Sequence, residues 1–300
     1  VTSSETGSIL VREFSQGSHE LSAVEQSALV QCSLFHGSFT TEAIEHVLSF
    51  DDLDPSVWPL DVVMSLLKRG LVETFEPLEH HSRFSLSAIA IGYAARARKE
   101  VSEATIAELK SRHAAFFARL GSESRIEALS KHHGGHHVYV LMLEQANLRA
   151  ALEFSLESDH AKSAAGLLMA YSALVNLKGP HQILTSFCER ILGGTSLSDG
   201  QRVRILLQHA RALRISVGTE PAKFAAQEAL KLAQRNENVH QVAVALGVLS
   251  MISLQEGLPK LALEQAHRSL AIHRTDNNRI YEGINLADIG IIQTTIGNLE

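Results

Sequence analysis

The last third of this chain contains a sequence repeat with a period of 40 residues. Val217, Gly257 and Gly297 stand at this interval, and other small or apolar residues recur in phase with them: Ala222 and Ala262, Ala226 and Ala266, Leu230 and Leu270, and Leu206, Leu246 and Leu286. A fixed period of this size is typical of stacked helical hairpins, in which one repeat cannot bury its apolar face alone. Such arrays usually present surfaces to partners, so the sequence favours interaction and regulation.

The period predicts pairs of helices. First helices are expected over 199–217, 239–256 and 279–296, and second helices over 221–235 and 260–273. Leu299 and Glu300 would begin the next second helix. Two further helices, 159–176 and 181–192, are expected to form a hairpin before the repeats.

The repeat pattern is similar to that of tetratricopeptide repeats. Ile289-Gly290 followed by Gly297 fits the first helix, and Gly257 followed by Ala262 fits the turn and the small contact residue of the second helix. The usual period is about 34 residues, so a 40-residue period predicts longer helices.

The beginning of the chain has a different pattern. Ser22 with Glu25 forms a capping box for the first of three short helices, Ser38 or Thr40 can cap the second, and Gly70 ends the third. These helices are expected over 22–34, 41–48 and 60–69, and two strands over 71–75 and 83–86. Three helices with a two-stranded hairpin predict a winged helix.

We therefore expect a mainly α fold: a winged helix with a small β hairpin, followed by an α-solenoid of tetratricopeptide-like helical hairpins. The expected parts are a polar linker or arm (1–20), the winged-helix domain (21–100), a connecting helical region (101–195) and the repeats (196–300). In the connecting part, 87–120 is predicted to be helical with a bend near Glu100, and 139–157 is predicted to be a single helix. The stretch 121–135 has a weaker helical pattern, and Gly193-Gly194 is expected to break the chain between helices.

Composition excludes several classes. A hydrophobic content of 45% excludes a mostly disordered chain, and a net charge of −6 argues against a general nucleic-acid or anionic-membrane binder. The sequence contains no run of about 18 apolar residues, so no transmembrane helix is expected. The start at Val1 lacks an initiator Met and the regions of a signal peptide, so we expect a cytoplasmic fragment of a longer protein.

Four motifs, in order, resemble one family. Residues 21–29 with 35–43 resemble "LSPAEQALLRRLSVFAGGFTLEAAEAV", residues 66–72 resemble "LVDKSLV", residues 83–86 with 93–94 resemble "RYRLLETVREYA", and residues 144–152 resemble "EHDNLRAAL". The family comprises bacterial signal-transduction ATPases with an NB-ARC-like core, including LuxR-type and related regulators of transcription. The resemblance implies a winged helix that follows a nucleotide-binding domain, and repeats that receive an inducer or a protein.

One part of the family pattern is missing. The family's nucleotide site needs a glycine-rich loop with Gly-Lys-Ser/Thr, and Gly134-Gly135 and Gly193-Gly194-Thr195 are not followed by Lys-Ser/Thr. We therefore expect no catalytic residue, no cofactor and no enzymatic activity in this chain. The nucleotide-binding domain would be a partner that lies outside it.

Histidines stand as two pairs in the run His132-His133-Gly134-Gly135-His136-His137. Imidazole pairs can chelate zinc, copper or nickel, but no Cys or carboxylate stands at ligand spacing nearby. The glycines favour a solvated loop, so no metal site is assigned. The alternative, a site formed by the two His pairs, stays open.

DNA binding is disfavoured. The third helix of the winged helix, 60–69, is mostly apolar, and residues 21–100 hold 11 acidic against 6 basic residues, which would repel phosphate. Nucleic acid is not an expected partner of this region.

The predicted partner site lies on the first helices of the repeats. Polar residues there could face a groove that receives a protein or a small-molecule inducer: Arg204, Gln208, Arg211, Asn285, Asp288 and Gln293. The alternative is that each is an ordinary exposed residue.

The expected role is the non-catalytic sensor and interaction region of a larger signal-transduction ATPase that regulates transcription. The rival hypotheses are a stand-alone tetratricopeptide adaptor, a DNA-binding winged-helix protein and an enzyme with an unrecognised site.

Overall fold

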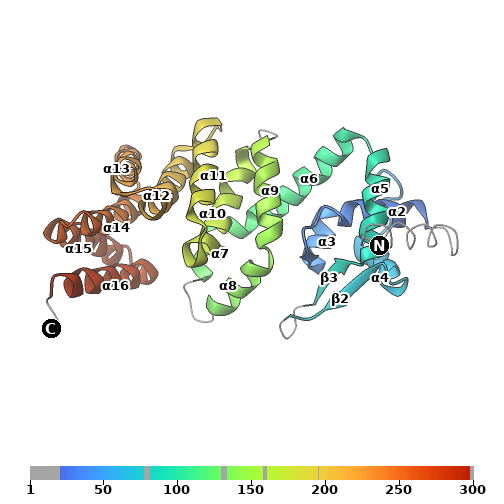
Figure 1. Ribbon diagram of the computed structural model, residues 1–300, viewed down its shortest axis with the longest axis horizontal. Coiled ribbons are helices and arrows are strands. Elements are labelled where there is room, and N and C mark those ends of the chain that lie inside the picture. The colour runs from blue at the N-terminus through green and yellow to red at the C-terminus, as the bar shows by residue number, and fades with distance from the viewer. Residues whose placement is uncertain (1–20, 78–81, 130–133, 158–160, 195, 298–300) are drawn as a thin grey trace, which may run out of the picture. The chain divides into compact units, whose positions relative to one another are not determined.

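The computed structural model describes residues 21–77, 82–129, 134–157, 161–194 and 196–297, so the expected arm at 1–20 and the start of a helix at Leu299 lie outside it. The described chain is mainly α-helical, with one small sheet and stacked helical hairpins (Figure 1). It divides into two compact units. The first holds residues up to Arg119 together with Leu143–Ser155, and the second holds Leu120–Met142 and the residues from Leu156 onward.

The first unit contains the elements that the sequence predicts for its helices and hairpin. The capping box forms, because Ser22 Oγ accepts from the Glu25 amide and the Glu25 carboxylate accepts from the Ser22 amide. Thr40 caps the second helix, and Gly70 follows the third with a φ of 70°. The elements are α2 (Ala23–Cys32), α3 (Thr41–Val47), α4 (Pro59–Lys68), β2 (Val72–Phe75) and β3 (Arg83–Leu86).

A third strand was not predicted. β1 (Ser38–Phe39) pairs antiparallel with β3, which places β3 in the centre of the sheet in the order β1-β3-β2. Ser38 lies opposite Ser85, and Phe39 lies opposite Phe84. Ser38 therefore belongs to a strand and does not cap α3, which leaves Thr40 as the cap.

Two predicted helices are broken. The stretch 87–120 divides into α5 (Ala88–Ala97), a 3-10 turn η1 (Arg98–Glu100) and α6 (Glu103–Ala118), whose start is capped by Ser102. The stretch 139–157 divides at Glu144 into α8 (Gly134–Leu143) and α9 (Gln145–Glu157). A 3-10 turn η2 (Arg119–Gly121) and a short helix α7 (Glu123–Ala128) lie between α6 and α8.

The second unit contains the predicted hairpins. They comprise α10 (Ala161–Lys178) with α11 (His181–Gly194), α12 (Asp199–Ser216) with α13 (Thr219–Arg235), α14 (Val239–Gln255) with α15 (Pro259–Thr275), and α16 (Arg279–Thr295). Gly193 and Gly194 were expected to follow α11 as a break, but they form its last two residues.

The 40-residue period is also visible in the caps. Ser198, Asn238 and Asn278 stand at this interval, and each side chain accepts a hydrogen bond from the amide three residues later. Capping of this kind satisfies an amide that has no partner within the helix. The starts of the first helices are therefore fixed at the same interval as their cores.

One hairpin turn departs from the period. Gly257 and Gly297 have φ values of 74° and 80°, but the residue in phase with them is Val217. A β-branched residue cannot adopt this conformation without strain. α12 instead runs to Ser216 and is one residue longer than α14, and Gly218 takes a φ of 148°.

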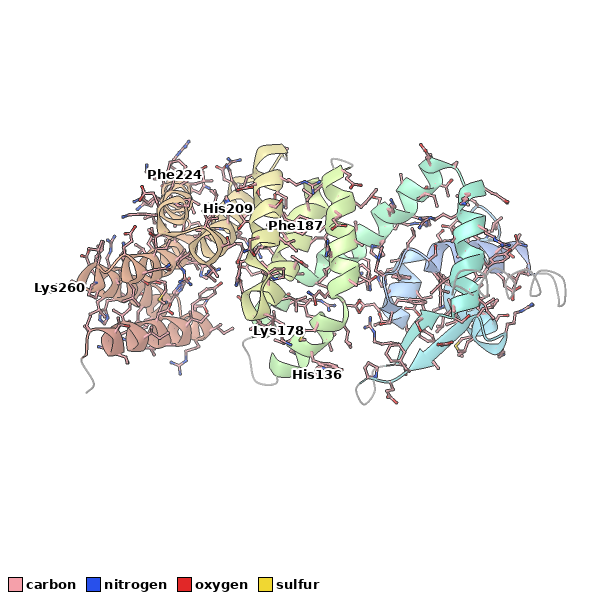
Figure 2. The ribbon with its side chains drawn as sticks, viewed as in Figure 1. His136, Lys178, Phe187, His209, Phe224 and Lys260 are labelled. Carbon is pink, nitrogen blue, oxygen red and sulfur yellow. The ribbon has the colours of Figure 1, made fainter. Side chains whose placement is uncertain are left out.

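Alanines hold the two layers of the repeats together. Ala222, Ala226, Ala262 and Ala266 are fully buried, at the two pairs of positions that the period relates. Small side chains let helices approach to the lower end of the usual 8–10 Å separation. The opposite sides of the second helices face solvent, where Phe224 and Lys260 are exposed (Figure 2).

Replacement of a buried alanine by a larger residue should loosen this packing. Ala266→Leu is expected to lower the free energy of unfolding by about 1–3 kcal/mol, because the added methyl groups have no space. Urea denaturation followed by circular dichroism measures the change. The control is Ala271→Leu, at an exposed position of the same helix. An equal effect of both variants would contradict the assigned packing.

Candidate functional site

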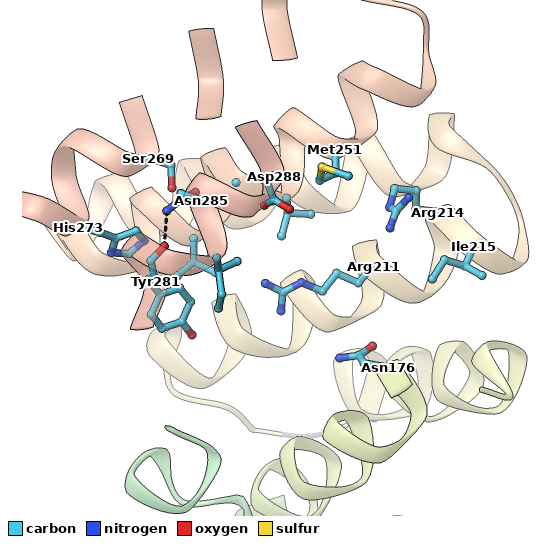
Figure 3. Close-up of a pocket in the computed structure, with 14 residues that line it drawn as sticks. Asn176, Arg211, Arg214, Ile215, Met251, Ser269, His273, Tyr281, Asn285 and Asp288 are labelled. Atoms are coloured by element: carbon cyan, nitrogen blue, oxygen red, sulfur yellow. Dashed lines mark hydrogen bonds between the residues drawn. The ribbon is translucent and has the colours of Figure 1, made fainter. Parts of the chain in front are cut away.

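The candidate site is a groove in the second unit, made of two adjoining cavities of about 320 and 380 Å³. The cavities share Asn176, Arg211, Val244, Tyr281 and Ile284, so we treat them as one surface, the repeat groove (Figure 3). Its walls come mainly from α10, α12, α14 and α16. Each of these helices contacts the next, α10 with α12, α12 with α14 and α14 with α16, because the first helices form one layer of the array.

The structure places five of the six predicted partner residues in the repeat groove. Arg204, Gln208 and Arg211 line it from α12, and Asn285 and Asp288 line it from α16. Gln293 lies one turn or more beyond Asp288, is exposed and lines neither cavity. Partner binding by these residues stays a prediction.

Hydrogen bonds hold several polar side chains of the groove in place. Asn176 Nδ2 donates to Gln208 Oε1 at 3.1 Å, which links α10 to α12. Arg214 Nη1 donates to Gln255 Oε1 at 3.2 Å, and Asn285 Nδ2 donates to the Tyr281 carbonyl at 2.9 Å. These groups have little freedom to follow a ligand.

Arg211 and Asp288 differ from these groups. Both face the first cavity, and neither makes a hydrogen bond or an ion pair with any residue in the described part of the chain. Burial lowers the pKa of Arg211, while Tyr281 and Asp288 act to raise it. Burial raises the pKa of the Asp288 carboxyl, while Arg211 and Arg214 act to lower it. The two charges attract each other across the cavity without meeting.

An aromatic cluster lies beside the groove, where His273 lines the first cavity, His240 lines the second, and Tyr281 lines both. The imidazole of His273 stacks on the ring of Tyr281 with their centroids 4.9 Å apart, and the ring of His240 stands edge-on to both. The side chain of His273 is fully buried, and neither ring nitrogen has a hydrogen-bond partner among the described residues. Burial, and then the neighbouring His240, lower the pKa of His273 to about 4, so the ring is neutral at pH 7.

Tyr281 and His273 were not predicted from the sequence. Each breaks the 40-residue phase: Tyr281 stands where the earlier repeats have Gln201 and Gln241, and His273 stands where the earlier repeat has the buried Ala233. A change of residue type at a repeated position is the signal that could have identified them.

The histidine run does not form a described metal site. His132 and His133 lie outside the described residues, and His136 and His137 are exposed in the first turn of α8, with ring centroids 5.8 Å apart (Figure 2). Within the part of the chain that the structure describes, no three His, Cys, Asp or Glu side chains gather in a way that could hold a metal ion.

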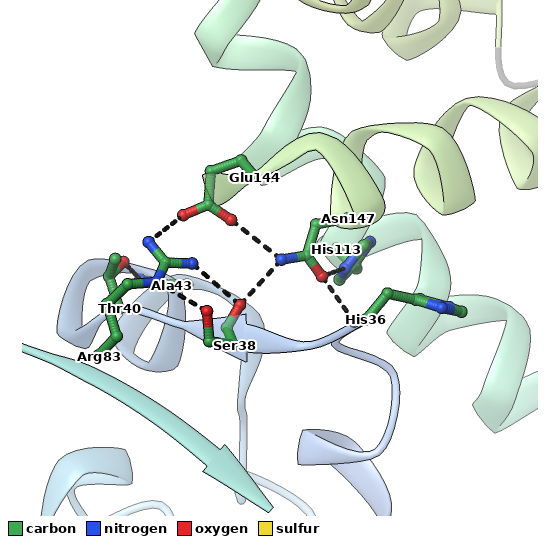
Figure 4. Close-up of polar contacts among 8 residues, drawn as sticks. All are labelled: His36, Ser38, Thr40, Ala43, Arg83, His113, Glu144 and Asn147. Carbon is green, nitrogen blue, oxygen red and sulfur yellow. Dashed lines mark hydrogen bonds and ion pairs between the residues drawn. The ribbon is translucent and has the colours of Figure 1, made fainter. Parts of the chain in front are cut away.

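The first unit contains a buried polar network around Arg83, which lies on the central strand β3 (Figure 4). Arg83 Nη1 donates to Glu144 Oε1 at 2.6 Å, and Arg83 Nε donates to Ser38 Oγ at 2.8 Å. Asn147 Nδ2 donates to Glu144 Oε2 at 2.9 Å and to the Ser38 carbonyl at 3.0 Å. The network joins β3 and β1 to the start of α9.

Asn147 also links the network to two histidines. Its Oδ1 accepts from the His36 amide at 2.7 Å and lies 3.5 Å from His113 Nε2. His113 packs against Phe117 with centroids 4.6 Å apart, and burial lowers its pKa to about 4. Every charge and amide in this network has a partner, which indicates a structural role rather than a binding site.

No family model and no curated protein matches this chain. Among solved structures, one similar chain is a signal transduction ATPase with numerous domains (STAND) protein with a tetratricopeptide repeat sensor, from Pyrococcus horikoshii. The sequences are 18% identical, the TM-score is 0.46, and the match covers 93% of this chain and 42% of that one. This chain therefore spans less than half of that protein's length.

Among the described residues, no helix is both long and apolar enough to cross a membrane.

The buried ion pair should be more important for stability than an exposed pair. Glu144→Ala is expected to lower the free energy of unfolding by about 3–5 kcal/mol, because it leaves the Arg83 charge buried without its partner. Glu42→Ala removes one partner of the exposed Arg119–Glu42 pair and should cost less than about 1 kcal/mol. The fluorescence of Trp58, the only tryptophan in the chain, reports unfolding of this unit. Equal losses in the two variants would contradict the role of the network.

Acid should destabilise the first unit through His113. The pKa of His113 is near 4 in the folded state and about 6.5 in an unfolded chain, so the unfolded state binds more protons below pH 6.5. Stability is present above pH 6.5 and is lost as the pH falls toward 4, by roughly 2 kcal/mol at about pH 5. Urea midpoints followed by Trp58 fluorescence over this pH range test the slope. His113→Gln should flatten it, and an unchanged slope in that variant would assign it to another group.

Proposed function

We propose that this chain is the non-catalytic sensor and interaction region of a larger signal-transduction ATPase, and that its repeat groove receives the effector. The observation that carries the proposal is the groove itself, in which Arg211 and Asp288 make no hydrogen bond or ion pair with any described residue. The four motifs in residues 21–152 support the assignment to an ATPase of this kind, because they resemble the winged-helix and linker segments of that family.

The proposed mechanism needs two states of the larger protein. The winged-helix region, residues 21–100, contacts the nucleotide-binding domain, and the repeats bind an inducer or a protein. An effector shifts the equilibrium only through a difference in its affinity for the two states. The output is regulation of transcription in the cytoplasm, with no catalytic residue or cofactor contributed by this chain.

Two alternatives remain as hypotheses. A stand-alone tetratricopeptide adaptor would use the same groove, and it differs in having no ATPase domain in the same polypeptide. A Gly-Lys-Ser/Thr loop upstream in the gene favours the ATPase. A DNA-binding role is less well supported, because Arg69 at the end of α4 is ion-paired with Glu25 at 3.0 Å and the region carries an acidic excess.

Photo-crosslinking tests the use of the groove. A benzophenone amino acid is placed at Ile284, which is about half exposed and lines both cavities, and in a second protein at Phe224, which is exposed on the outer side of α13. After irradiation in cells, the protein is purified and its mass is measured. We expect an adduct of one defined partner or small molecule at Ile284 that is absent at Phe224. The same adducts at both positions, or none at Ile284, would contradict the proposal.

A further inference from the structure

We propose that the repeat groove binds a small zwitterion of the amino-acid type, with its carboxylate on Arg211 and its ammonium group on Asp288. This inference rests on the proposed function and specifies its ligand. The ligand class follows from the charges, the unpaired polar atoms and the apolar wall of the first cavity.

The charges of the first cavity favour a ligand that carries both signs. Arg211 on α12 and Asp288 on α16 line the same cavity and are not within ion-pair distance of each other or of any other described charge (Figure 3). Partly buried charges without a partner are costly, so each gains from a ligand group of opposite sign. A guanidinium can hold a carboxylate through two parallel hydrogen bonds.

Ligands of a single charge fit less well. A simple anion would be attracted by Arg211 and Arg214 but repelled by Asp288, and a simple cation would meet two arginines. Arg214 is also held by Gln255, which leaves Arg211 as the arginine without a protein partner. A zwitterion pairs with Arg211 and Asp288 together.

His273 supplies a second, independent sign of a ligand. Its ring is fully buried at the edge of this cavity, and both of its nitrogens lack a hydrogen-bond partner among the described residues. A buried polar group without a partner is rare in folded proteins and costs free energy until something satisfies it. A neutral imidazole offers one donor and one acceptor, which suits either end of a zwitterion.

The remaining wall of the cavity is apolar. Ile215 and Ile284 are about half exposed there, and Val248 and Met251 lie beside them on α14. A volume of about 320 Å³ lies at the lower end of the range for small-molecule sites, which suits a single amino acid or a dipeptide with an apolar side chain.

Isothermal titration calorimetry with three forms of each probe tests the proposal. The probes are L-leucine, L-phenylalanine and the dipeptide Leu-Leu, each compared with its amide and its N-acetyl derivative. We expect at least one zwitterion to bind at concentrations up to about 10 mM, and its amide and N-acetyl forms to bind about tenfold more weakly. An amide or an N-acetyl form that binds as tightly as the zwitterion overturns the assignment, and so does the absence of binding by all three zwitterions.

Variants assign the two ends of the ligand. Arg211→Met should weaken the zwitterion about tenfold and remove its advantage over the amide, because the carboxylate then has no partner. Asp288→Asn should remove the advantage over the N-acetyl form. Arg211→Lys keeps the charge and should keep part of the affinity. Arg235→Met, at an exposed position of α13 outside both cavities, is the matched control.

Folding and function are separated by two further measurements. Circular dichroism melts show whether each variant keeps the helical array, and Arg211→Lys serves as the readout if Arg211→Met unfolds. Weakening by Arg235→Met equal to that by Arg211→Met overturns the site. If the zwitterions fail but Ile284 still crosslinks to a protein, the ligand assignment is wrong and the proposed function stands. If both fail, the proposed function is wrong as well.

Discussion

The close packing of alanines between the two helix layers of the repeats is the constraint on which the rest of the second unit depends. Ala222, Ala226, Ala262 and Ala266 are fully buried and occupy equivalent positions of α13 and α15. A larger residue at any of them would separate a second helix from its first helix. Because the alanines let the α12–α13 and α14–α15 hairpins pack in the same way, α12 and α14 come to lie against each other and form part of the walls of the repeat groove.

The groove differs from an ordinary surface in how its polar groups are satisfied. Asn176, Gln208 and Asn285 are held by hydrogen bonds within the protein, whereas Arg211, Asp288 and His273 have no hydrogen-bond partner among the described residues. The buried network of Arg83, Glu144 and Asn147 in the first unit is the contrast, because each of its groups has a partner. In the groove, these unsatisfied groups favour a ligand, whereas the satisfied network around Arg83 stabilises the fold.

The sequence predicted the repeats well because alanines recur at the 40-residue interval on the second helices, and because Gly257 and Gly297 mark two of the turns at the same interval. Periodicity did not predict the elements whose formation depends on tertiary contacts. β1 has two residues, which is too short for any alternation to show, and its pairing with β3 depends on residues 45 positions away. The break at Glu144 was missed because the apolar pattern of 139–157 continues through it.

The groove was predicted through its polar residues on α12 and α16, since the helices that carry them followed from the period. The neighbours of those residues were harder to predict. Tyr281 and His273 were missed because they replace Gln and Ala at repeated positions, and a search for recurrence discards such exceptions. Gln293 was grouped with these residues although it lines neither cavity, because helical spacing identifies a polar residue but does not show how far along α16 the groove extends.

The chain crosses three times between the two units, because Leu120–Met142 belongs to the second, Leu143–Ser155 returns to the first, and the residues from Leu156 onward belong to the second again. During synthesis the first unit cannot close when its N-terminal stretch has emerged, since Glu144 and Asn147 are made only after a segment of the other unit. Arg83 can pair with the carboxylate of Glu144 only after some sixty further residues have been translated. No single cut of the polypeptide can release either unit intact, so the two are coupled in their order of assembly.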